Sequence, residues 1–451
     1  MGTVGINFGS ATSGTGFDVA STVTAILADQ QAIETPWKTQ LATLQAQDTV
    51  FTTLGTDLST LSTSLQSLTD AEGVLAEKQG SSSDTNVVAL TSASSSAVAG
   101  SHTIVVNSLA TTASNYSAEI ANASDTLTGG ITINGQTLNV VTGTSDTLST
   151  FAAAINQAAL GVTASVITDA SGSRLSLVSN TSGAAGSITI SSTLQDGSTA
   201  IGFTQAQGGA NASLSVDGLT ISSASNTVTG AIPGVTFQLL ASAPTESVQI
   251  QVTNDNSAIE SAVNTFVNSY NAVIADINDQ EKNDSSGNPE PLFGSPTLSL
   301  IQTQLQAALF GGSASGSISN IAQLGLSVSD DGTLTFDSSA LDSALNSNFS
   351  DIQGFLQNTS SFGQNLTTTL NNLGTQAPDG AIYLAQQQNS TQESELNTNI
   401  TNENATLATE QTTLTAELNQ ANQILQAIPE QLNEINEIYS AVSGFNQNTG
   451  S

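Results

Sequence analysis

The side chains that most often carry out catalysis or bind metals are scarce in this sequence. His102 is the only histidine and cysteine is absent, so a histidine-based triad, a cluster of histidine ligands and a thiolate metal site are all excluded. His102 stands in the run SHTIVVN, which has the β-branched composition of a strand. We therefore expect this histidine to have a structural or exposed role.

Acidic residues form pairs and one loose group. Asp217-Gly218 and Asp330-Asp331-Gly332 have the composition of tight turns, and no other reactive group lies near them in the sequence to support acid–base catalysis. The loose group consists of Asp276, Asp279, Glu281 and Asp284. Its spacing lacks the pattern of a Ca²⁺ loop, and no phosphate-binding glycine loop or nucleophile elbow occurs. We predict that the chain is not an enzyme and needs no metal or cofactor.

The charge of the chain restricts its partners. Only 9% of the 451 residues are charged, and the net charge is -33. The basic residues are Lys38, Lys78, Arg174 and Lys282. Such a chain is not expected to bind nucleic acid, and without an apolar run of about 18–20 residues it is not expected to insert into a membrane.

The composition indicates an extracellular protein. The chain is rich in Thr, Ser, Asn and Gly, as secreted bacterial surface proteins often are, and its opening MGTVGINFGSATSGTGFDVA lacks the basic and apolar regions of a Sec signal peptide. We therefore expect export by a specialised route.

The first predicted element is a long amphipathic helical region that begins near Asp18 and continues to about Leu75. Pro36 should break or kink it. Its apolar residues recur at the spacing of one helix face. They are Val23, Ile26, Leu27, Ile33, Trp37, Leu41, Leu44, Phe51, Leu54, Leu58, Leu61, Leu65 and Leu68.

A second apolar row, with alternating spacings of three and four, lies near the other end and contains Pro429. It comprises Leu396, Ile400, Leu407, Leu414, Leu418, Ala421, Leu425, Ile428, Leu432, Ile435, Tyr439 and Val442. Because one helix cannot bury its own stripe, we expect the two terminal segments to pack together in a coiled-coil stalk.

The middle of the chain has the period of β-strands. Residues 131–141 read as a hairpin around Asn134-Gly135, residues 147–159 as a short helix, and residues 161–180 as two strands around Asp169 to Gly172. Helical spacing returns at 259–277, 298–310 and 339–357, with a short strand pair at 324–337. The predicted fold class is α+β multidomain, with a helical coiled-coil stalk formed by both termini and inserted β-rich head domains.

These patterns divide the chain into six parts. They are an N-terminal leg, partly disordered (1–45), a stalk helix (46–80), a β-rich head domain (81–115 and 212–253), an inserted α+β head domain (116–211), a helical stalk domain (254–400) and a C-terminal leg helix (401–451). The solvent faces of the legs hold mainly Thr, Ser, Gln and Asn, which form helices poorly, so we expect both legs to be marginal in the monomer.

Three blocks in order resemble the flagellar filament cap family, hook-associated protein 2. They are NTVTGAIPGVTFQLL (226–240), TNDNSAIESAVNTFVNSYNAVIADIN (253–278) and IAQLGLSVSDDGTLTFDSSALDSAL (321–345). Residues 155–179 also resemble the IN repeat that flagellins and hook-associated proteins share. The resemblance covers almost the whole chain.

The resemblance implies a protein that caps the distal end of the flagellar filament as a ring of identical subunits and helps exported flagellin to fold and insert there. It also implies export through the flagellar type III apparatus with a chaperone, contact with the hook–filament junction proteins, and an extracellular place at the filament tip. The residues expected to contact partners are Val23, Ile26, Leu27, Ile33, Trp37, Leu41, Leu425, Ile428, Leu432, Ile435 and Tyr439.

Two alternatives remain open at this point. A flagellin-like filament subunit would share the helical termini and the IN repeat, although flagellins lack the LGLSVSDDGTLTFD block. A secreted surface adhesin would account for the Thr-, Ser- and Asn-rich head.

Overall fold

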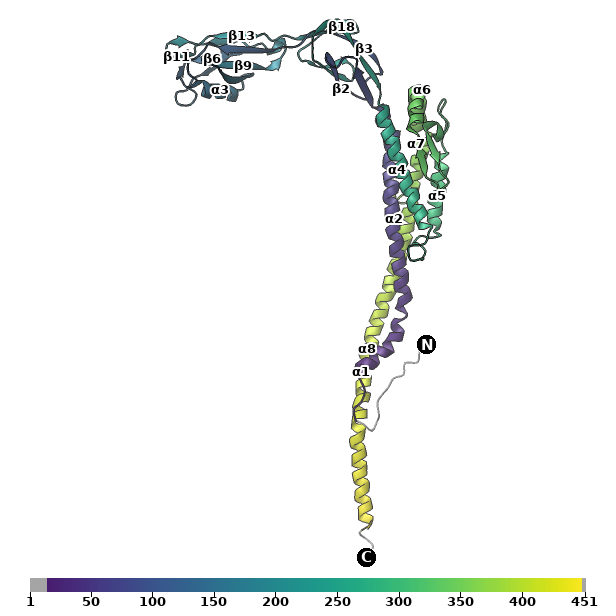
Figure 1. Ribbon diagram of the computed structural model, residues 1–451. Helices are drawn as coiled ribbons and strands as arrows, with labels where there is room; N and C mark the ends of the chain where they lie inside the picture. Colours follow the sequence, from purple (N-terminus) through teal and green to yellow (C-terminus); the bar gives the residue numbers. More distant parts are fainter. Residues whose placement is uncertain (1–13, 448–451) are drawn as a thin grey trace. The chain divides into compact units, whose positions relative to one another are not determined.

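The computed structural model describes residues 14–447, and its contacts separate the chain into two compact units (Figure 1). The first unit combines both ends of the chain, Met1–Thr69 and Val263–Ser451, and is largely helical. The second unit, Asp70–Ala262, holds most of the strands. The predicted α+β class, with helical termini and an inserted β-rich region, is confirmed.

The first unit contains seven helices among the described residues. They are α1 (Val19–Gln31), α2 (Glu34–Thr69), α4 (Asn256–Gln280), whose first residues belong to the second unit, α5 (Pro296–Leu309), α6 (Ser338–Gln357), α7 (Phe362–Leu373) and α8 (Ala381–Gln447). A hairpin of β19 (Leu326–Val328) and β20 (Leu334–Phe336) follows a 3₁₀ turn at Ile321–Leu324.

The break between α1 and α2 confirms the expectation for Pro36. Asp18 caps α1 by accepting hydrogen bonds from the backbone N–H groups of Ala20 and Ser21. The helix ends at Gln31, and α2 begins at Glu34, so Pro36 lies in the first turn of α2. Proline is tolerated there, since the first N–H groups of a helix have no partner within it.

The C-terminal end of α2 differs from the expectation. The helix stops at Thr69 rather than near Leu75, and a separate 3₁₀ turn follows at Val74–Ala76. Asp70 explains the stop, because its side chain accepts a hydrogen bond from the N–H of Glu72 at 3.0 Å. Asp that bonds to a nearby backbone group in this way favours a turn over continued helix.

The predicted apolar row of α2 packs against the neighbouring helices α6, α7 and α8, and we call this buried contact the seam. Its buried side chains are Leu44, Phe51, Leu54, Leu58, Leu61, Leu65 and Leu68. The polar contacts show that α2 and α8 run antiparallel, since Asp48 meets Asn389 while Thr52 meets Gln386 (Figure 1). Each buried leucine contributes about 1.5–3 kcal/mol relative to exposure.

One part of the second unit is a two-sheet β structure. The larger sheet has the order β1-β18-β3-β14-β15 and the smaller one β16-β17-β2. The strands are β1 (Lys78–Ser82), β2 (Val88–Ala93), β3 (Gly100–Ser108), β14 (Ala212–Val216), β15 (Leu219–Ser223), β16 (Thr227–Ile232), β17 (Val235–Leu239) and β18 (Ala243–Asn254). Alternate side chains of both sheets, such as Ile104, Leu214 and Phe237, form one buried core.

A second core in this unit is built around α3 (Leu148–Gln157) and a four-stranded sheet of order β13-β4-β9-β8. Those strands are β4 (Thr112–Ser117), β8 (Val162–Thr168), β9 (Ser173–Ser182) and β13 (Phe203–Gln207). Two smaller sheets complete it: β6 (Gly130–Ile133) and β7 (Gln136–Asn139) with β10 (Ile190–Ser192), and β5 (Leu127–Thr128) with β11 (Gln195–Asp196) and β12 (Thr199–Ala200).

The hairpin predicted from Asn134-Gly135 is confirmed. Ile133 pairs with Gln136, and the two residues between them have φ values of 54° and 80°. Positive φ at both central positions defines the tight turn that Asn-Gly favours. The helix expected over residues 147–159 and the strand pair expected over 161–180 are present as α3, β8 and β9.

Candidate assembly surface

The predicted contact residues on α1 are partly used inside the chain. Val23 and Leu27 are buried together with Leu407 of α8, and Leu414 and Leu418 pack partly against them. This small cluster holds α1 on α8. A contact with another molecule through Val23 or Leu27 would therefore require α1 to move away from α8.

The remaining predicted residues near the N-terminus are more accessible. Ile26, Trp37 and Leu41 are half-buried, whereas Ile33 is 51% exposed. Ile33 lies in the break between α1 and α2, so neither helix directs its side chain into the seam. These residues offer a discontinuous apolar surface.

The C-terminal part of α8 carries the clearest unpartnered row. Leu425 and Ile428 are half-buried, but Leu432, Ile435 and Tyr439 are 42%, 60% and 73% exposed. Ile438 and Val442, also exposed, extend this row, which we call the α8 row (Leu432, Ile435, Ile438, Tyr439 and Val442). A helix normally directs such a row against a partner, and the described part of the chain leaves it uncovered.

Polar groups weaken the seam between the terminal helices. Glu34 is buried at the start of α2, where one carboxylate oxygen pairs with Lys38 at 2.5 Å and the other has no hydrogen-bond partner. Buried side-chain oxygens of Gln30 and Glu393 also lack partners. An unsatisfied buried acceptor costs about 1–3 kcal/mol, so the seam is less stable here than its apolar content implies.

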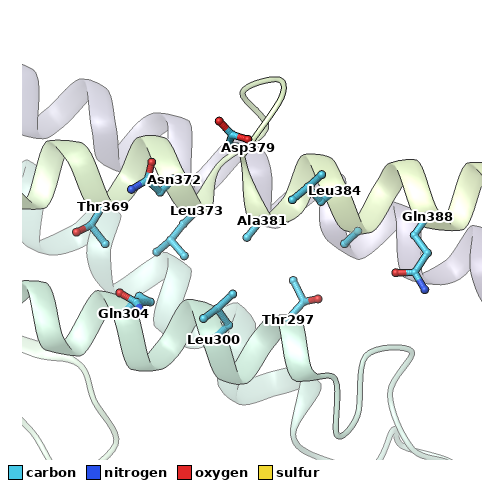
Figure 2. Close-up of a pocket in the computed structure, with 11 residues that line it drawn as sticks. Thr297, Leu300, Gln304, Thr369, Asn372, Leu373, Asp379, Ala381, Leu384 and Gln388 are labelled. Carbon is cyan, nitrogen blue, oxygen red and sulfur yellow. The ribbon is translucent and has the colours of Figure 1, made fainter.

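A groove runs between α5, α7 and α8. Its larger hollow has a volume of about 470 Å³, and Leu300 of α5 faces Leu373 and Ala381 across it (Figure 2). A second hollow of about 420 Å³ shares Thr297, Ala385 and Gln388 with the first. Asp379 is the single charged residue lining the two hollows. The other lining side chains are aliphatic, aromatic, amide or hydroxyl groups, so the groove has the chemistry of a packing surface.

His102 and Asp217, which were considered for catalysis, form hydrogen bonds that stabilise the fold. His102 Nδ1 lies 2.7 Å from a carboxylate oxygen of Asp217, whose other oxygen accepts a hydrogen bond from the N–H of Thr103. The bond to His102, followed by the bond to Thr103, lowers the pKa of Asp217. Together they tie the turn between β14 and β15 to β3.

The loose acidic group does not converge on a common point. Asp279 pairs with Lys282 at 2.9 Å, and Asp284 accepts bonds from the N–H groups of Ser286 and Asn288 within its own loop. Over residues 14–447, no three His, Cys, Asp or Glu side chains are grouped as a metal site requires. The same range contains no helix that is both long and apolar enough to cross a membrane.

Three asparagines missed by the sequence analysis each form hydrogen bonds with both backbone groups of one residue elsewhere in the chain. Asn156 pairs with Ala164, Asn226 with Ala110 and Asn271 with Leu334, at distances of 2.6–3.0 Å. In each pair the side-chain oxygen accepts from the backbone N–H and the side-chain NH₂ donates to the carbonyl. A carboxamide that bonds in this way takes the place of a neighbouring strand at one residue.

Two family models match the chain in order. The model of the flagellar hook-associated protein 2 N-terminus matches residues 15–113, and that of the flagellar hook-associated protein 2 C-terminus matches residues 209–430. The two matches cover both terminal helical regions and the two-sheet β structure, and α3 lies between them.

Curated relatives and a solved structure agree with these matches. The chain is 30% identical to the B-type flagellar hook-associated protein 2 of Pseudomonas aeruginosa, over 70% of this chain and 74% of that protein. It is 29% identical to the flagellar hook-associated protein 2 of Escherichia coli, over 80% of this chain and 84% of that protein.

The crystal structure of the D1–D2–D3 domains of the Escherichia coli flagellar cap protein FliD matches the fold. The two are 26% identical with a TM-score of 0.57, over 75% of this chain and 99% of the other. This chain therefore belongs to the flagellar hook-associated protein 2 family, a structural family of flagellar cap proteins and not a family of enzymes.

Proposed function

We propose that this chain caps the distal end of the bacterial flagellar filament and promotes the folding and insertion of exported flagellin at the tip. Membership in the hook-associated protein 2 family is the observation that carries this function. The family match also disfavours a filament subunit or an adhesin as the main role. The chain acts at the flagellar tip as a structural assembly factor.

The working form is a ring-shaped homo-oligomer. Its legs, residues 1–45 and 401–451, contact neighbouring subunits and the filament below, and its β-rich heads, residues 81–253, cover the tip. The α8 row supports this arrangement, because Ile435 and Tyr439 are exposed in the single chain although they have the spacing of an interface. Ile26 of α1, and Ile33 in the break between α1 and α2, extend the same contact surface.

Weak leg contacts allow the ring to move. The unpaired buried oxygens of Glu34 and Gln30 lower the stability of the seam between the terminal helices. Legs that exchange between alternative contacts let the ring advance as each flagellin is added, whereas a tight seam would fix it. Flagellin can then bury its own apolar face in the gap that opens beneath the heads.

The chain reaches the tip from inside the cell. We propose that it travels through the flagellar type III export apparatus, bound beforehand by an export chaperone, and is placed outside the cell above the hook–filament junction proteins. Its lack of cysteine and its scarcity of basic residues are compatible with this route.

Electron microscopy of mixed components tests the proposal. Purified chain is added to filaments assembled from purified flagellin, and the ends are imaged with and without the protein. A ring-shaped density at the distal end alone is expected. Density along the filament wall, or none at either end, would reject the capping function.

A further inference from the structure

The β8 strand lies at the edge of its sheet. The order β13-β4-β9-β8 leaves one side of β8 without a neighbouring strand. Edge strands expose unpaired N–H and C=O groups, which proteins usually protect with charged residues, proline or a covering element. The sequence of β8, VTASVIT, contains neither charge nor proline. The protection must therefore come from outside the strand.

Asn156, near the C-terminal end of α3, contacts the edge of β8. Its side-chain oxygen accepts a hydrogen bond from the N–H of Ala164 at 2.7 Å, and its NH₂ group donates to the carbonyl of Ala164 at 2.8 Å. The two backbone groups of Ala164 therefore point away from β9, toward the open side of the sheet. Ile155, fully buried beside Asn156, holds α3 in place.

We propose that Asn156 closes the edge of β8, so that a strand of a second copy of the chain cannot pair with it. The carboxamide occupies the middle of the edge, where an incoming strand would have to form its own hydrogen bonds. This assigns a physical role to the asparagine of the IN repeat, independently of the capping function.

The opposite edge of the same sheet shows why closure matters. β13, with the uncharged sequence FTQAQ, is the other edge strand and is largely exposed. All pairings in the sheet are antiparallel, so β13 and β8 run in opposite directions. β8 of one copy and β13 of another would thus meet as an antiparallel pair. Such a head-to-tail contact can repeat from copy to copy and produce fibres.

The chain contains a matched control for the loss of the hydrogen bonds themselves. Asn226 donates to the carbonyl of Ala110 at 3.0 Å and accepts from its N–H at 2.7 Å, in the same arrangement. Ala110, however, lies between β3 and β4 and not on a strand edge. Truncation of Asn226 removes equivalent bonds without opening an edge.

The test compares the full-length variants N156A, N156D and N226A with the unchanged protein. Sedimentation measures self-association, and hydrogen exchange at low and high protein concentration locates it. N156A should associate at least about tenfold more strongly than the unchanged protein, with concentration-dependent protection in β8 and β13. N226A should lose stability without a change in association.

N156D separates opening of the edge from loss of stability. The aspartate fills the same space and can accept from the N–H of Ala164, but it cannot donate to the carbonyl, and its charge opposes an incoming strand. It should be destabilised but should not associate. If N156A does not fold, N156S replaces it, because the shorter hydroxyl also leaves the edge open.

Three outcomes would overturn the proposal. One is that N156A associates no more strongly than the unchanged protein. Another is that N226A or N156D associates as strongly as N156A. The third is association of N156A that leaves the protection of β8 unchanged.

Discussion

Asn271 of α4 pairs with both backbone groups of Leu334 in β20, accepting from its N–H at 2.6 Å and donating to its carbonyl at 2.8 Å. Leu334 and Val328 are opposite each other in the hairpin, and the adjacent bond from the Ser329 N–H to the Thr333 carbonyl points between the strands. The backbone groups of Leu334 therefore point outward, to Asn271. This pair joins two of the sequence blocks that resemble the cap family.

Truncation of Asn271 should detach the β19–β20 hairpin from α4. N271A leaves both backbone groups of the buried Leu334 without partners, which costs about 1–3 kcal/mol, so the thermal midpoint should fall by about 2–8 °C. N278A is the matched control, since Asn278 donates a single exposed bond to the carbonyl of Asp331. Differential scanning calorimetry measures both. Equal shifts for the two variants would contradict this account.

Leu27 and Tyr439 should affect different states of the protein. L27A removes a side chain that is only 5% exposed, so it should release α1 from α8 at a cost of about 2–5 kcal/mol. Hydrogen exchange of the monomer reports that release in α1.

Y439A removes a side chain that is 73% exposed, so the monomer should be unchanged while ring formation is weakened. A Y439A protein that assembles normally would show that the α8 row is not an interface.

Asp276 should make stability depend on pH. Burial, then a hydrogen bond and charge repulsion from Asp57, raise its pKa to about 6. The folded state thus binds the proton more tightly than the unfolded state, so the stabilisation is present at low pH and is lost as the pH rises through about 6. D276N should raise the thermal midpoint by about 2 °C at pH 8 and change it little at pH 4.

The control for this effect is D29N, which removes one charge from an exposed position on α1. It separates the local interaction with Asp57 from the general reduction of negative charge. An equal gain for D29N at pH 8, or a gain for D276N that does not depend on pH, would contradict the assignment.

Ring assembly should strengthen with salt. Each subunit carries a formal charge of -33, and added ions screen the repulsion between subunits. Sedimentation at about 20 mM and 300 mM NaCl should show more oligomer at the higher concentration. Weaker assembly at the higher concentration would mean that specific ion pairs, and not repulsion, dominate the interface.

Local patterns in the sequence predicted much of the fold. The leucine spacing of α2 and the Asn134-Gly135 turn each depend on neighbouring residues, and the structure confirms both. The predicted end of α2 was wrong because the hydrogen bond from the N–H of Glu72 to the side chain of Asp70 ended the helix before its apolar pattern ended.

The assembly surface could not be predicted from the sequence alone. Leu27 and Ile435 belong to apolar rows of similar spacing, yet one is buried and the other exposed, since within residues 14–447 only the first has another helix beside it. The partner of Asn226 is 116 residues away, and no local pattern identifies it. Such contacts exist only after the chain has folded.

The most direct test of the capping function is the amount of monomeric flagellin in the medium of a strain that lacks this gene. We predict abundant released flagellin and absent or short filaments, with both defects corrected by adding the purified protein. Filaments of normal length without released flagellin would contradict the capping function.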